Sequence, residues 1–100
     1  MNIEIKEQNG SYIGILKGWI DTAESSQFLE DMTPLMDNAD KRIELNCDQL
    51  DYICSMGLRG ILQLKRESTA KGGSMILTHV KSEVEKILKI TGFNRLLDIR

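Results

Sequence analysis

The chain has 100 residues, enough for one domain that buries a core and too few for two, so we expect a single domain over 1–100. Its 13 Lys and Arg and 15 Asp and Glu give a net charge of −2, which argues against a nucleic-acid groove and a polybasic membrane patch. One His and two Cys are too few for a structural zinc site, and we expect no metal and no other cofactor.

The hydropathy pattern predicts a cytoplasmic protein without membrane insertion. No apolar run approaches the roughly 20 residues that span a bilayer. Residues 1–5 lack the charged and apolar regions of a signal peptide. Two cysteines, Cys47 and Cys54, fit a compartment in which thiols stay reduced.

Two short strands are predicted at the start of the chain. Ile3 and Ile5 alternate with polar residues over 2–7, which is the pattern of a half-buried strand. Asn9-Gly10 predicts a tight hairpin turn, after which residues 11–17 return as a second strand. We therefore expect an antiparallel pair.

A helix is predicted next, over about 23–37, with Asp21 or Thr22 as its cap. Pro34 lies inside this pattern and should kink or restart the helix, because it lacks an N–H and crowds the preceding turn. The apolar residues at helical spacing are Phe28, Leu29, Met32, Leu35 and Met36.

The second half of the chain alternates strands with helices. In chain order we expect a strand over 41–46, a connection over 47–54, a helix from 55 to Gly72-Gly73, a strand over 74–78, a helix over 81–90 with Ser82 as a candidate cap, and a packing segment over 93–99. The resulting order, β-β-α-β-α-β-α, predicts an α/β domain with a mostly parallel mixed sheet flanked by helices.

Ligands and partners of such sheets meet the loops at the carboxyl ends of the parallel strands. Three predicted loops share that edge: Gly18–Thr22, Cys47–Gly57 and His79–Ser82. Ser55 falls at the expected N-cap of a helix, where the dipole and free N–H groups favour a phosphate, and Arg59 could pair with it four residues later. From the local pattern alone, a plain helix cap is the alternative interpretation of Ser55.

The segment Leu50–Arg59 (Leu-Asp-Tyr-Ile-Cys-Ser-Met-Gly-Leu-Arg) resembles the signature of STAS domains, in particular the bacterial anti-sigma factor antagonists. Gly18–Ala23 resembles the family's Gly-x-Leu-Asp segment, and Gly72-Gly73 before an apolar strand matches its third stretch. Val84–Leu97, with Thr91-Gly92-Phe93, resembles the closing helix and its turn. The resemblance covers nearly the whole chain and implies a STAS-like single domain.

The resemblance implies a binding switch that is not itself an enzyme. In the family, a cognate anti-sigma factor with a histidine-kinase-like ATPase fold phosphorylates the serine before the small residue and Gly, and the unphosphorylated antagonist binds this kinase and frees a sigma factor. A PP2C-type phosphatase resets the switch. By position the phosphoacceptor is Ser55, and Asp21 matches the family's Asp near the partner's nucleotide site.

Three positions depart from the family's pattern. Cys54 stands where many members have Asp and a subgroup has Ser, Met56 replaces Ser, Thr or Ala, and Trp19 replaces a common Glu. We expect Trp19 in a loop, either as an interface anchor or folded over the core. The expected partner-binding residues are Trp19, Asp21, Thr22, Cys54, Met56, Gly57 and Arg59.

Two alternative functions remain open from the sequence. The same fold serves as a STAS subunit of membrane transport systems, such as ABC-type lipid or anion transporters. An enzyme with Cys54 as nucleophile is the second alternative, although no paired base is visible and a small packed residue explains Cys54 as well. Titration of the thiol distinguishes this alternative from a binding protein.

Overall fold

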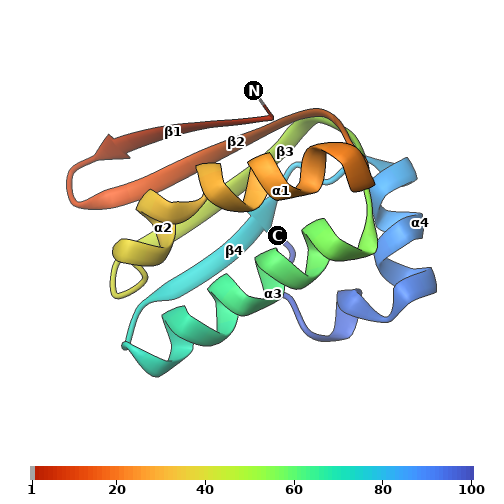
Figure 1. The fold of residues 1–100 in the computed structure, drawn as a ribbon. Coiled ribbons are helices and arrows are strands. Elements are labelled where there is room, and N and C mark those ends of the chain that lie inside the picture. Colours follow the sequence, from red (N-terminus) through yellow and green to blue (C-terminus); the bar gives the residue numbers. More distant parts are fainter. Residues whose placement is uncertain (1) are drawn as a thin grey trace.

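Residues 2–100, which the computed structural model describes, form one four-stranded sheet with the order β1-β2-β3-β4 (Figure 1). β1 (Ile3–Gln8) pairs antiparallel with β2 (Ser11–Ile20). β2 pairs parallel with β3 (Arg42–Ile53), and β3 pairs parallel with β4 (Ser74–Thr78). The predicted α/β class, the antiparallel start and the mostly parallel sheet are confirmed.

The hairpin between β1 and β2 follows directly from its two turn residues. Asn9 and Gly10 both have positive φ, 54° and 79°. Turns with positive φ at both central residues match the twist of the two flanking strands, and Asn-Gly adopts them readily. Gln8 and Ser11 therefore pair across the turn.

Three helices cover one face of the sheet (Figure 1). α1 (Thr22–Asp31) and α2 (Thr33–Asp37) lie beside α3 (Ser55–Ala70) and contact it. α4 (Ser82–Thr91) packs against β3 and is followed by a short 3-10 helix, η1 (Phe93–Arg95). Figure 1 places α4 at the end of the sheet where β3 leads into α3.

The core lies between the sheet and these helices. Alternate residues of the strands point into the core, and the apolar face of each covering helix packs against them. Its largest fully buried side chains include Phe28, Leu35, Ile43, Leu45, Leu58, Ile61 and Leu64. The opposite residues of β3, such as Glu44 and Asn46, remain partly exposed.

Two of the expected element boundaries are wrong. β2 continues to Ile20 and β3 to Ile53, so most of the predicted loop over 18–22 and nearly all of the connection over 47–54 is strand. The pairing of β2 with β3 shifts register between Ile15 and Lys17 and again between Gly18 and Trp19. These irregularities interrupt the alternation of inward and outward residues, so the period-two pattern does not predict this part of the strand.

The predicted helix over 23–37 is two helices. α1 ends at Asp31, and Pro34 lies in the first turn of α2, where a missing N–H costs nothing. Pro34 thus restarts the helix, one of the two outcomes expected. Ser82 is the first residue of α4 rather than its cap, which is Lys81.

The segment after α4 returns to the sheet. Gly92 ends α4 with φ 80°, as a glycine at this position favours. The backbone N–H of Leu77 donates to the carbonyl of Asp98 at 2.8 Å, and that of Arg100 donates to the carbonyl of Leu77 at 2.8 Å. Leu97 is buried, so this segment closes the edge of β4 and packs as expected.

One polar atom is poorly accommodated in this core. Among residues 2–100, the hydroxyl of Ser68 on α3 is buried and has no hydrogen-bond partner. We expect Ser68→Ala to raise the free energy of unfolding by about 1 kcal/mol, because it removes an unsatisfied donor and improves helix propensity. Urea denaturation measures this gain.

The control for Ser68→Ala is Ser26→Ala, at an exposed position of α1. This change carries the same difference in helix propensity without burial, so its gain should be about 0.5 kcal/mol or less. Equal gains at both positions would show that the buried hydroxyl of Ser68 costs nothing.

Candidate functional site

The carboxyl ends of β2 and β3 lie side by side and lead into α1 and α3. The backbone N–H of Cys54 donates to the carbonyl of Ile20 at 2.9 Å, which holds the two strand ends in line. Parallel strands of a sheet carry their sites at this edge. The structure thereby brings the segments around Asp21 and Ser55 together.

Ser55 is the first residue of α3 and is exposed. The N-cap is Cys54, with extended φ and ψ of −82° and 170°, so the expectation that Ser55 is the cap is wrong. Cys54 makes no side-chain capping bond, and the first turn of α3 has no acidic residue. Its free N–H groups therefore favour an anion at this end of the helix, where Ser55 is exposed.

Asp21 is the N-cap of α1. Its carboxylate accepts a hydrogen bond from the backbone N–H of Glu24 at 3.0 Å. The capping role expected of Asp21 or Thr22 thus belongs to Asp21, and Thr22 is an exposed residue of the first turn. Whether either residue contacts a partner stays a prediction.

Trp19 lies in β2, not in a loop as expected, and 59 % of it is exposed. It neighbours Tyr52 across the strand pair, and the two rings stack with centroids 4.6 Å apart and an interplanar angle of 22°. Trp19 therefore does not fold over the core. Tyr52 was missed as part of this aromatic pair, because only the shifted register of β2 and β3 brings it opposite Trp19.

Met56 lies one residue after Ser55 and is 43 % exposed. The hydroxyl of the buried Ser25 on α1 lies 3.1 Å from the sulfur of Met56 and 2.8 Å from the carbonyl of Thr22, with a geometry in which it can donate to either. Met56 thus joins the first turns of α1 and α3. Arg59, one turn further along α3, is exposed.

Gly57 and Cys54 lie beneath this surface. A Cβ on Gly57 would come within 2.8 Å of Cγ1 of Ile53, so its lack of a side chain lets α3 pack on the chain's own β3.

Both cysteines are buried, and Cys54 is 8 % exposed. For Cys47, burial raises the pKa of the thiol to about 12, so Cys47 stays protonated at neutral pH.

An ion pair that was not predicted from the sequence connects the start of α4 to the edge of the sheet that carries Ser55. Nζ of Lys81 donates to a carboxylate oxygen of Asp51 at 2.8 Å. The hydrogen bond to Asp51 raises the pKa of the Lys81 amine. Both groups are too exposed for the pair to contribute much stability, but it ties the end of β3 to the start of α4.

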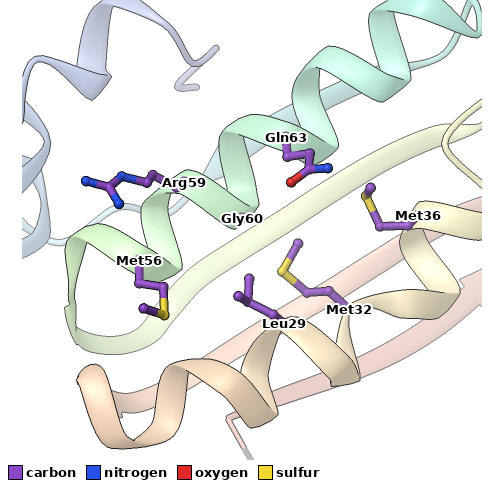
Figure 2. A pocket seen from close by; sticks show the side chains of 7 residues that line it. All are labelled: Leu29, Met32, Met36, Met56, Arg59, Gly60 and Gln63. Carbon is purple, nitrogen blue, oxygen red and sulfur yellow. The ribbon is translucent and has the colours of Figure 1, made fainter.

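A groove lies between α1–α2 and α3 and has a volume of about 240 Å³ (Figure 2). We call it the methionine groove. Its lining residues are Leu29, Met32, Met36, Met56, Arg59, Gly60 and Gln63. It begins at Met56, next to Ser55, and was not foreseen from the sequence, because β3 separates α1 and α2 from α3 in the chain.

Within residues 2–100, no helix combines the length and hydrophobicity that crossing a membrane requires. Nor do the His, Cys, Asp and Glu side chains of this part of the chain gather into a group that could hold a metal ion.

A family model described as the STAS domain matches residues 2–100. BtrV of Bordetella bronchiseptica, described as an anti-sigma factor antagonist, is 28 % identical over 93 % of this chain and 80 % of its own length. The solved anti-sigma factor antagonist SpoIIAA, in its unphosphorylated form, is similar with a TM-score of 0.77 and 21 % identity, over 98 % of this chain and 87 % of that one. SpoIIAA of Bacillus in its phosphorylated form has a TM-score of 0.71 and 18 % identity, over 98 % and 90 % of the two chains.

Proposed function

The chain belongs to the STAS domain family, and we propose that it is an anti-sigma factor antagonist that phosphorylation of Ser55 switches off. The observation that carries the proposal is the exposed Ser55 at the first position of a 16-residue helix, with no side-chain cap before it. Relatives support it, since BtrV is described as such an antagonist and SpoIIAA exists in a phosphorylated form.

The proposed partner is an anti-sigma factor with a histidine-kinase-like ATPase fold, and the proposed resetting enzyme is a PP2C-type phosphatase. We propose that residues 1–100 act as one unit in the cytoplasm and bind without catalysis. The surface offered to the partner combines the exposed Trp19 and Met56 with Thr22 and Arg59. Exposed aromatic and methionine side chains are common anchors of protein interfaces.

Phosphate on Ser55 should change binding far more than folding. The dipole and free N–H groups of α3 favour an anion at its start by about 0.3–1 kcal/mol, so the fold tolerates the modification. The same phosphate adds about −1.5 to −2 charges beside Met56, where the proposed partner makes close contact. Desolvating that charge opposes binding.

The test is calorimetric titration of the purified anti-sigma factor from the same genome with wild type and Ser55→Asp. We expect Ser55→Asp to bind about tenfold more weakly or worse, which corresponds to about 1.4 kcal/mol or more. Its melting temperature should stay within about 8 °C of wild type, because the change in stability should remain below about 1 kcal/mol.

Ser74→Asp is the control, since Ser74 is an exposed serine at the amino end of β4, opposite to the sheet edge that carries Ser55. It should bind the anti-sigma factor as wild type does. Undiminished binding by Ser55→Asp would overturn the switch. A wild-type chain that binds no such kinase and instead co-purifies with ABC transporter subunits would replace the proposal with the transport role.

A further inference from the structure

The methionine groove is formed by close approach of α1 and α3. A Cβ on Gly60 would lie 2.0 Å from Cδ2 of Leu29, so only a glycine permits this spacing without displacing that side chain. Figure 2 shows Leu29 of α1, Met36 of α2 and Met32, the residue between the two helices, reaching toward α3. The groove thus has a floor of apolar side chains between two helical walls.

The volume and the lining suit an apolar side chain from another molecule. An apolar cavity of about 150 Å³ accommodates benzene, and this groove of about 240 Å³ is larger. Three of its seven lining residues are methionines, whose flexible and polarisable side chains adapt to varied apolar partners.

The rim of the groove carries a single charge, which is positive. Arg59 is the one charged residue among those that line it, and Figure 2 shows its side chain extending from α3 away from Leu29, Met32 and Met36. No acidic residue in the described part of the chain forms a salt bridge with Arg59, whereas Lys65 on the same helix pairs with Asp98 at 2.9 Å. An unpaired guanidinium on an exposed rim is complementary to a carboxylate.

We propose that the methionine groove is where the anti-sigma factor anchors, through a large apolar side chain inserted between α1–α2 and α3 and a neighbouring carboxylate paired with Arg59. This inference rests on the proposed function and specifies the chemistry of the partner's contact. The occupant is an acidic segment with one or two large apolar residues.

The same geometry gives phosphorylation a second way to release the partner. Ser55 and Arg59 are four residues apart on α3, the spacing at which an anion and a following cation pair on a helix. A phosphate on Ser55 therefore competes with the partner's carboxylate for Arg59. It also stands beside Met56, where the groove begins.

The first measurement is binding of the same purified anti-sigma factor to Arg59→Glu, with Arg66→Glu as matched control. Arg66 is an exposed arginine of α3 about two turns further on and does not line the groove. We expect Arg59→Glu to weaken binding about tenfold or more and Arg66→Glu to change it less than about threefold. In the Ser55→Asp background Arg59→Glu should cost less, because the two changes remove the same contact.

The second measurement follows the methionine methyl groups by NMR, with ¹³C-labelled methionine, as the unlabelled anti-sigma factor is added. The methyl signals of Met32, Met36 and Met56 should shift, and that of Met75, fully buried in β4, should stay. These shifts report occupancy of the groove independently of the charge reversal.

Failure of this inference differs from failure of the proposed function. A wild-type chain that does not bind the anti-sigma factor overturns both. Wild-type binding that is lost in Ser55→Asp but kept in Arg59→Glu, with the three groove methyl signals unmoved, overturns the groove alone and leaves the switch standing.

Discussion

Gly73→Ala is expected to destabilise the protein by about 3 kcal/mol or more. A Cβ at Gly73 would lie 2.2 Å from the carbonyl oxygen of Ala39 and 2.6 Å from that of Lys41. Both obstacles are backbone atoms, which cannot rotate away as a side chain can. The backbone N–H of Ser74 also donates to the carbonyl of Lys41 at 3.2 Å, so this contact aligns the starts of β3 and β4.

The adjacent Gly72 provides the control for that substitution. It has φ 80°, but nothing lies within 4 Å of its Cβ position. Gly72→Ala therefore meets only the conformational penalty of a left-handed residue, about 1–2 kcal/mol. Urea denaturation of both variants separates the two causes. A loss at Gly73 no greater than the loss at Gly72 would contradict the close packing of the two backbones.

Phe28→Ala is expected to lower the free energy of unfolding by about 3–5 kcal/mol. Phe28 lies on α1, is completely buried and belongs to the core under the sheet. Its removal loses the transfer free energy of a benzyl group and leaves a cavity. In a domain of 100 residues, a loss of this size should lower the melting temperature by about 12 °C or more.

The only other phenylalanine is the control for Phe28. Phe93, in η1, packs against the core but remains partly exposed. Phe93→Ala should cost about 1–2 kcal/mol, because less apolar surface leaves contact. Calorimetric unfolding of both variants tests the difference. A loss of stability at Phe93 equal to that at Phe28 would contradict the deeper burial of Phe28 in the core.

The element types could be predicted where the pattern is local. The alternation around Ile3 and Ile5, the turn at Asn9-Gly10 and the proline restart near Pro34 each depend on residues adjacent in the chain. The continuation of β3 to Ile53 could not be predicted in this way. Its residues pair with β2 across a register shift, and the pairing energy comes from a strand about 30 residues away.

The candidate site likewise contains residues that could be recognised from the sequence and others that could not. The segment around Ser55 was recognisable because its residues stand together in the sequence. The stacking of Trp19 on Tyr52, the ion pair of Lys81 with Asp51 and the methionine groove were not, since each joins separate elements. Gly57 was expected among the partner-binding residues, and the structure shows it packed against Ile53 of the same chain.

By itself, the sequence determined the order of strands and helices, the α/β class and the place of Ser55 near the start of a helix, since hydrophobic periodicity and turn residues act over short distances. Only the tertiary structure decided which of these residues share a surface. It made Cys54 the cap and left Ser55 exposed, and it set Met56 and Arg59 on a groove with α1 and α2. Those outcomes depend on the spacing of packed helices, to which residues far apart in the chain contribute together.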